Sequence, residues 1–192
     1  MTLTPFVRHT GKCAALPRAN VDTDQIIPKQ FLKRVERTGF GPALFHDWRS
    51  NPEFELNQPE ARDATILITG ANFGCGSSRE HAVWALAEYG FRAIVAPSFA
   101  DIFTANCCQN GVAPVRLSGD SIDELIRRCR GGRGSYRLTI DLEAQRVTDD
   151  AGFGSSFSME PYRREMLLRG LDEIGRTLLE ESRITTYERS RA

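Results

Sequence analysis

The sequence predicts an α/β fold in three layers, with a central, mostly parallel sheet, added hairpin strands and C-terminal helices. Three short runs of β-branched and apolar residues lie between residues 64 and 117, separated by two stretches of helical length. Each helical stretch ends at a glycine, Gly90 or Gly111, which is typical of a helix C-terminus. Strands and helices that alternate in this way favour parallel strands joined by right-handed crossovers.

The N-terminal third is predicted to hold one strand and a long loop-rich segment. Residues 6–16 alternate weakly between polar and apolar side chains, which indicates a strand at the edge of the sheet, in a hairpin. An acidic turn and a short apolar run follow over residues 20–28, and Pro28 ends regular structure there. Glycines and prolines interrupt residues 29–62, so we expect loops and short helices that are functional or mobile.

The middle of the chain contains the clearest alternation of strands and helices. The apolar residues of its first helix cover most of the circumference, so we expect that helix to be buried. A glycine-bearing loop at residues 70–76 precedes it. We expect strands at residues 64–69, 92–96 and 112–117, and helices at residues 78–89 and 98–110.

The C-terminal third is predicted to begin with an amphipathic helix and to end with further helices. Apolar residues within 122–129 repeat at the i, i+3, i+4 and i+7 spacing of one helix face. Residues 138–157 alternate as a strand and then a hairpin. Residues 160–192 form a helical extension, broken at Gly170 and near Ser182.

Length and composition predict one domain over residues 1–192, because a domain has roughly 150 residues. No boundary is sharper than the glycine-rich turn at residues 131–134. Hydrophobic residues make up 41% of the chain, enough for a core. The 25 basic and 25 acidic residues balance, whereas a sequence-independent nucleic-acid binder needs a basic excess to neutralise phosphates. That class of protein is therefore excluded.

The sequence is also unlike that of a membrane or secreted protein. No apolar run approaches the roughly 20 residues that a membrane helix needs. Residues 1–5 lack the charged and apolar regions of a signal peptide. The five cysteines are odd in number and irregularly spaced, which argues against a disulfide framework. We therefore expect a cytoplasmic protein.

The loop at residues 72–81 holds the most suggestive groups of the chain. Gly74 and Gly76 let the backbone approach a ligand closely, and free N–H groups at a helix start favour an anion. Ser77 and Ser78 add hydroxyls, and the guanidinium of Arg79 matches a carboxylate bidentately. Such a loop can bind a carboxylate substrate, and its donors also favour a deprotonated serine.

A structural alternative explains part of the same pattern. Ser77 and Glu80 have the spacing of a capping box, which leaves two glycines, a second serine and an arginine unexplained. A P-loop needs a lysine before its Ser or Thr, and a dinucleotide fingerprint needs a third glycine where Arg79 stands. Both motifs are absent, so an anion site and a helix cap remain the two interpretations.

Cys75 and His81 are interpreted as structural residues. Cys75 has no partner at metal-binding spacing, and the adjacent Cys107 and Cys108 do not form a Cys-x-x-Cys motif. We interpret Cys75 as a small packing residue and His81 as a polar group on a buried helix face. We expect this chain to bind no metal or cofactor of its own, so any metal must come from elsewhere.

Several motifs carry a resemblance to a known family. Residues 72–81, Asn-Phe-Gly-Cys-Gly-Ser-Ser-Arg-Glu-His, resemble the signature of the swivel domain of the aconitase superfamily. Residues 20–31 resemble the opening motif of isopropylmalate isomerase small subunits, and residues 39–48 and 98–103 fit as well. The similarity continues in order to about residue 188. Val83, where many relatives have proline, is a small departure outside these motifs.

The resemblance implies an aconitase-type swivelling β/β/α domain that closes over a large subunit in a heterodimer. It implies that the large subunit carries a [4Fe–4S] cluster with one iron free to bind substrate. The implied reaction dehydrates 2-isopropylmalate to 2-isopropylmaleate and rehydrates it to 3-isopropylmalate, in leucine biosynthesis. This division of roles would explain a lyase site without metal ligands.

The resemblance also implies the roles of individual residues. The first serine of the pair in this family removes the proton next to a carboxylate, which makes Ser77 the base here. Ser78 and Arg79 would hold a substrate carboxylate. Asp24 matches an active-site aspartate, and an Asx-turn residue is the alternative. A serine acts as a base only in electropositive surroundings, which the helix start, Arg79 and the cluster iron would supply.

Substrate recognition is expected from residues 28–62, and within them from residues 28–38, which look like the recognition loop of the family. Phe31 and Leu32 suit an isopropyl group, and Lys29 stands beside them. An ordinary amphipathic loop or short helix is the alternative, and we expect the stretch to be mobile in the isolated chain. Lys33, Arg34 and Val35 complete the loop.

Two other functions remain open. The chain could serve a related hydro-lyase of the citraconate–methylmalate or homoaconitate type, in which case its deletion would not prevent growth without leucine. A non-catalytic anion-binding or regulatory module is the second alternative. In that case Ser77→Ala would leave the assembled enzyme fully active.

Overall fold

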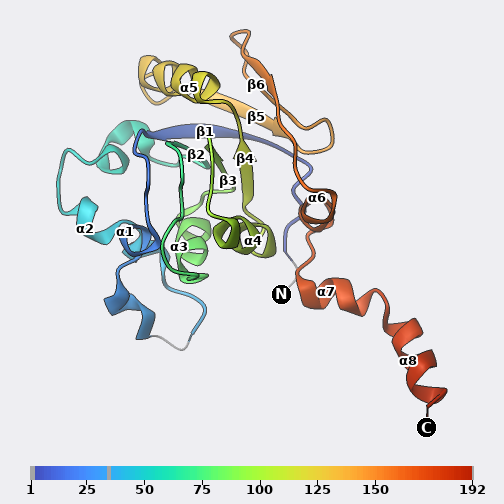
Figure 1. The fold of residues 1–192 in the computed structure, drawn as a ribbon. Helices are drawn as coiled ribbons and strands as arrows, with labels where there is room; N and C mark the ends of the chain where they lie inside the picture. Colours follow the sequence, from blue (N-terminus) through green and yellow to red (C-terminus); the bar gives the residue numbers. More distant parts are fainter. Residues whose placement is uncertain (1–2, 34–35, 192) are drawn as a thin grey trace.

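A seven-stranded sheet organises the computed structural model, which describes residues 3–33 and 36–191 (Figure 1). The strand order is β4-β3-β2-β1-β5-β6-β7. Strands β1 to β4 pair in parallel, and β5, β6 and β7 continue the sheet in antiparallel pairing. The strands are β1 (Arg8–Leu16), β2 (Ile66–Thr69), β3 (Ala93–Ala96), β4 (Ala113–Arg116), β5 (Arg137–Asp141), β6 (Arg146–Thr148) and β7 (Gly154–Ser156).

The predicted β-α-β-α-β unit is confirmed. Helix α3 (His81–Tyr89) connects β2 to β3, and α4 (Asp101–Gln109) connects β3 to β4. Both helices begin three residues later than predicted, because the loops before them extend across the carboxyl end of the sheet. Gly90 ends α3 in the left-handed conformation with φ of 119°, as expected for a helix C-terminus.

Two apolar cores lie on opposite faces of the sheet and produce the three predicted layers. Alternate residues of one strand point to opposite faces, so Leu67 joins one core while Ile66 and Ile68 join the other. Helices α3 and α4 cover the first face, together with the segment between β1 and β2. Helix α5 (Gly119–Gly131) covers the second face (Figure 1).

Strand β1 is central in the sheet, so the predicted edge position of residues 6–16 is wrong. It pairs in parallel with β2, Cys13 opposite Ile66, and antiparallel with β5, His9 opposite Ile140. The weak alternation arises because the second half of the strand is buried on both faces, with Cys13 in one core and Leu16 in the other.

The segment between β1 and β2 is loop-rich with short helices, as predicted. The carboxylate of Glu88 on α3 accepts hydrogen bonds from the backbone N–H groups of Gly39, Phe40 and Gly41, at 3.0, 2.6 and 2.8 Å. This segment is therefore tied to α3 directly after residues 28–38. Its helices are α1 (Thr23–Ile26), η1 (Lys29–Lys33), η2 (Gly41–Ala43), α2 (His46–Arg49), η3 (Glu55–Asn57) and η4 (Pro59–Ala61).

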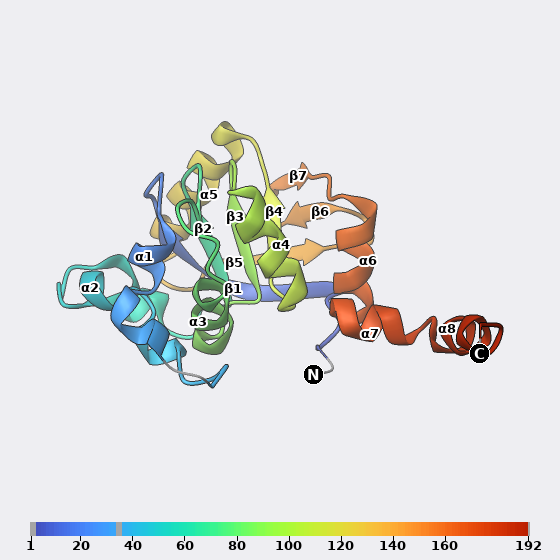
Figure 2. The ribbon, with the colours of Figure 1, turned by 60° about the horizontal axis from the view of Figure 1, so that its bottom comes forward.

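The C-terminal helices leave the body of the molecule. Helix α6 (Pro161–Arg169) packs against it through Met166 and Leu167 and ends at Gly170, where a break was predicted. Helices α7 (Glu173–Leu178) and α8 (Glu181–Arg189) extend outward as an arm (Figures 1 and 2). The second break lies at residues 179–180, slightly before its predicted position near Ser182.

Candidate functional site

Three loops meet at the carboxyl ends of the parallel strands. The loop after β2 lies between the loop after β1 and the loop after β3. The N–H of Gly74 donates to the carbonyl of Val21 at 2.8 Å, and the N–H of Phe73 donates to the carbonyl of Ser98 at 3.1 Å. Ligands of open α/β sheets bind in this position, so the fold places residues 72–81 where a ligand site is expected.

Two glycines let the central loop turn. Gly74 and Gly76 have φ angles of +74° and +89°, in the region that residues with a side chain rarely adopt. A Cβ at Gly74 would also stand 2.1 Å from Cγ of Phe103 on α4. Position 74 therefore needs glycine for both its conformation and its contact with α4.

The serine pair stands exposed at the tip of this loop. Helix α3 begins at His81, and the residue before it, Glu80, makes no side-chain capping bond, so the predicted capping box is not formed. Asn110, the C-cap residue of α4, instead donates to the Glu80 carboxylate at 2.8 Å. Across residues 3–33 and 36–191, neither the Ser77 nor the Ser78 hydroxyl forms a hydrogen bond. The helix-cap interpretation therefore fails, and both hydroxyls face solvent.

Arg79 and Asp24 form an ion pair across two loops. One nitrogen, Nη1, contacts one carboxylate oxygen of Asp24, which leaves other donors of the fork for a ligand. The Arg79 side chain is 20% exposed and that of Asp24 is 40% exposed. The local turn role falls to Asp22, whose carboxylate accepts from the Gln25 N–H at 2.8 Å in a capping box.

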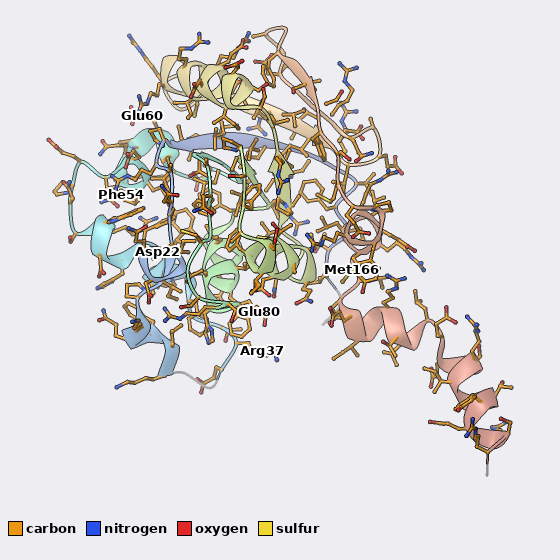
Figure 3. All side chains as sticks on the ribbon, in the orientation of Figure 1. Asp22, Arg37, Phe54, Glu60, Glu80 and Met166 are labelled. Atoms are coloured by element: carbon orange, nitrogen blue, oxygen red, sulfur yellow. The ribbon has the colours of Figure 1, made fainter. Side chains whose placement is uncertain are left out.

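Asp22 and Glu80 lie on the α1 and α3 side of the molecule (Figure 3). Sequence reasoning missed the capping box of Asp22 and Gln25, although the pattern Asp-x-x-Gln at residues 22–25 signals it. Sequence reasoning also missed that the Thr23 hydroxyl hydrogen-bonds the backbone of Ser77, for which no local signal exists.

The surroundings of Cys75 and His81 favour the uncharged form of each side chain. Burial raises the pKa of the Cys75 thiol, and the nearby Asp22 carboxylate raises it further. Burial lowers the pKa of His81. The Glu80 carboxylate raises this pKa by a smaller amount, and the charge of Arg79 lowers it slightly. The His81 ring contacts those of Phe40 and Trp84, with centroids 5.2 and 4.6 Å away. These surroundings favour the structural interpretation of both residues.

The three proposed recognition residues lie in or beside the short helix η1. Lys29 is exposed, whereas Phe31 and Leu32 pack partly buried against the core. The ring of Phe31 meets that of His46 edge-on at 4.9 Å. In the described part of the chain these three residues make no hydrogen bond or ring contact with residues 72–81. The neighbouring Arg34 and Val35 lie outside the described residues.

The donor groups of the described residues do not fit a metal centre. Among the described residues, no group of three or more His, Cys, Asp or Glu side chains could hold a metal ion. All five cysteines are free, and four of them are buried. No helix in residues 3–33 and 36–191 is long and apolar enough to cross a membrane.

Two family models match this chain, one after the other, between residues 3 and 161. The model described as "Aconitase C-terminal domain" matches residues 3–120. A second model, described as "LeuD_N", matches residues 123–161. The first covers the parallel strands and the three loops of the candidate site.

Full-length relatives share more than half of their residues with this chain. A "3-isopropylmalate dehydratase small subunit" of Geobacillus kaustophilus is 58% identical, covering 97% of each protein. One of Bacillus subtilis with the same name is 54% identical over 99% of this chain and 98% of the relative. One of Rhodopirellula baltica, also so named, is 57% identical over 97% of this chain and 98% of the relative.

A solved structure has the same fold. The crystal structure of 3-isopropylmalate dehydratase (leuD) from Methanocaldococcus jannaschii superposes with a TM-score of 0.68. It covers 95% of this chain and 99% of its own, at 24% sequence identity.

Proposed function

The chain belongs to the family of 3-isopropylmalate dehydratase small subunits, and from this we propose that it supplies the base and the carboxylate clamp of that hydro-lyase. The enzyme interconverts 2-isopropylmalate and 3-isopropylmalate through 2-isopropylmaleate, in leucine biosynthesis. The names of the relatives support this substrate over the citraconate–methylmalate and homoaconitate alternatives.

One observation carries the assignment of the site. Two serine hydroxyls without a partner in the described chain stand beside an arginine that an aspartate holds in place, at the carboxyl ends of the parallel strands. These hydroxyls make no contact that stabilises the fold of the described chain, so they are available to bind a substrate. Since a buried or paired hydroxyl would be unavailable, this exposure supports a catalytic role over a capping role.

We assign each residue a role on that basis. Ser77 Oγ removes the proton from the carbon next to a substrate carboxylate. Ser78 Oγ and the free donors of Arg79 hold that carboxylate, since a guanidinium fork matches it bidentately. Asp24 hydrogen-bonds Arg79 and fixes its direction. The positive charge of Arg79 lowers the free energy of the Ser77 alkoxide.

The large subunit is the partner that the name of the family implies. From the resemblance to this family we assign a [4Fe–4S] cluster to that subunit, where it would act as a Lewis acid on the leaving hydroxyl. The exposed tip of residues 76–78 would face the cluster when the two subunits close into a heterodimer.

Recognition of the substrate is assigned to the segment at residues 28–62, within a single swivelling domain that residues 160–192 extend. Phe31 and Leu32 would border the isopropyl group, with Lys29 at the rim. We place the protein in the cytoplasm, away from membranes and nucleic acid. Its five free cysteines suit a reducing compartment.

Reconstitution of the complex tests the proposal. The chain is co-expressed with the large subunit of the same genome, the cluster is rebuilt anaerobically, and 2-isopropylmaleate is followed by its ultraviolet absorbance. We expect activity only in the mixture, and Ser77→Ala should lower kcat by at least about 100-fold, as loss of a general base does. The Ser135→Ala variant is a matched control, because this exposed serine lies in a distant turn.

Two outcomes would contradict the proposal. Full activity of Ser77→Ala in the complex would favour the non-catalytic module. A complex that forms but leaves 2-isopropylmalate unchanged would favour another substrate, which the loss of ultraviolet absorbance with citraconate or homoaconitate would detect.

A further inference from the structure

Thr23 is a buried polar residue directly beneath the serine loop. In residues 3–33 and 36–191, Thr23 and Thr69 are the polar residues that are buried as whole residues, with 1% and 0% of their surface exposed. Thr23 is the first residue of α1, after the capping residue Asp22. A buried hydroxyl without hydrogen bonds is unfavourable, so its partners explain why it is there.

Those partners belong to the serine loop. The Thr23 Oγ1 accepts a hydrogen bond from the N–H of Ser77 at 3.2 Å and donates one to the Ser77 carbonyl at 3.1 Å. The N–H of Thr23 donates to the carbonyl of Cys75 at 2.9 Å. A hydroxyl both donates and accepts, so one side chain holds both backbone groups of the same serine.

Gly76 gives the loop the turn that this contact needs. It lies between the two residues that Thr23 contacts and has φ of +89°. A Cβ at Gly76 would lie 3.5 Å from the Thr23 Oγ1, so the loop passes closely over the threonine. The backbone of Ser77 is thereby fixed at both its N–H and its carbonyl, and the direction of its Cβ follows.

We propose that Thr23 is the residue that positions Ser77, and that its hydroxyl sets the aim of the serine Oγ at the substrate proton. This inference rests on the proposed function, in which Ser77 is the base. Thr23 does not touch the substrate. Its loss should therefore act on the chemical step, where a misplacement of about 1 Å lowers the rate by about 100-fold.

Two substitutions of Thr23 separate its hydroxyl from its shape. Thr23→Val keeps the volume and removes the hydroxyl, whereas Thr23→Ser keeps the hydroxyl. In the reconstituted complex we expect Thr23→Val to lower kcat by about 10-fold to 100-fold with KM close to that of the wild type. Thr23→Ser should restore most of the lost kcat.

Thr69→Val is the matched control, because it removes the other buried threonine hydroxyl. Thr69 Oγ1 donates to the carbonyl of Arg18 at 3.3 Å and not to Ser77. A general loss of stability would affect both valine variants alike. An equal fall of kcat in Thr69→Val, or an unchanged kcat in Thr23→Val, would overturn the proposal.

Hydrogen exchange of the full chain alone gives a second readout that needs no activity. The Ser77 amide should exchange faster in Thr23→Val than in the wild type, Thr23→Ser or Thr69→Val. If the wild-type complex proves inactive, the proposed function fails while this exchange measurement still decides the contact. Unchanged exchange at Ser77 in Thr23→Val would refute the positioning role in either case.

Discussion

Gly74 and Gly76 stand two residues apart in the loop that presents Ser77, but a side chain would meet different surroundings at each. Both have positive φ angles, which disfavours any L-residue by about 1 kcal/mol. At Gly74 a Cβ would also clash with the ring of Phe103 at 2.1 Å, whereas at Gly76 the nearest atom is 3.4 Å away. The two glycines therefore permit a paired test.

We expect Gly74→Ala to lower the free energy of unfolding by about 3 kcal/mol, from backbone strain and overpacking together. Gly76→Ala should lower it by about 1 kcal/mol, from strain alone. Urea unfolding of the two variants beside the wild type measures both values. Equal losses would mean that the Phe103 ring moves aside without a free-energy cost.

The fork of Arg79 should matter more than its charge. Arg79→Lys keeps the charge but cannot contact Asp24 and a substrate carboxylate bidentately. Because hydrogen bonds to charged groups contribute about 1.5–3 kcal/mol, we expect KM to rise at least about tenfold. Steady-state kinetics of the complex measure this. Arg18→Lys is the control, since Arg18 forms a two-point contact with Glu55 instead; a similar rise in KM there would contradict the specific role.

At the scale of elements, Glu88 of α3 anchors the chain directly after the recognition loop at residues 28–38. Its two carboxylate oxygens accept three consecutive backbone N–H groups, from residues 39–41. Glu88→Gln replaces one oxygen with a donor, so at least one of these bonds is lost. We expect the free energy of unfolding to fall by about 1 kcal/mol and the amides of residues 39–41 to exchange faster.

Hydrogen exchange and urea unfolding check this expectation. Glu143→Gln is the matched control, since Glu143 is exposed and makes no hydrogen bond or ion pair with other described residues. If exchange at residues 39–41 stays slow in Glu88→Gln, the anchor lies elsewhere.

The hairpin of β6 and β7 depends on one buried carboxylate. The Asp149 side chain is 2% exposed, and burial alone would raise its pKa. Hydrogen bonds from the Phe153 N–H, the Tyr136 hydroxyl and the Ala151 N–H outweigh burial, and with the charge of Arg128 they lower the pKa below 3.8. The folded state therefore favours the charged form.

A lowered pKa in the folded state fixes the sign of a pH effect. The unfolded chain binds the proton more readily, so the contribution of Asp149 to stability is full above the unfolded pKa of about 3.8 and is lost as the pH falls through the folded pKa. We expect the free energy of unfolding, measured with urea, to be higher for the wild type than for Asp149→Asn. This difference should be constant above about pH 5 and become smaller below pH 4. A difference independent of pH down to pH 3 would contradict this.

At the scale of the whole molecule, the C-terminal arm adds little to the stability of the body. Ile174, Leu178 and Tyr187 are 72%, 60% and 58% exposed, and α7 has six residues and α8 nine. Removing residues 171–192 should change the free energy of unfolding by less than about 1 kcal/mol, since little apolar surface is buried there.

A second truncation, which removes more of the chain, provides the comparison for the free energy of unfolding. Removing residues 160–192 also deletes Met166 and Leu167, both 2% or less exposed, and each buried side chain contributes about 2–5 kcal/mol. Thermal unfolding should therefore separate the two truncations clearly. A large loss from the arm alone would show that α7 and α8 pack on the body in solution.

The sequence by itself determined the parallel β-α-β-α-β unit, the loop-rich segment, the hairpin at residues 147–157 and the serine loop. These features are local, because strand and helix periodicity, glycine positions and motif spacing are set within a few residues. The family resemblance, too, rests on such short motifs.

Only the tertiary structure decided the rest, because it depends on partners far apart in the chain. The central place of β1 follows from pairing with strands that begin 58 and 129 residues after Arg8, at Ile66 and Arg137. Helix α3 starts at His81 because Asn110 hydrogen-bonds the Glu80 carboxylate and the Thr23 hydroxyl hydrogen-bonds the backbone of Ser77. Local spacing offers the capping box as an equally good solution, and only contacts across 30 and 54 residues exclude it.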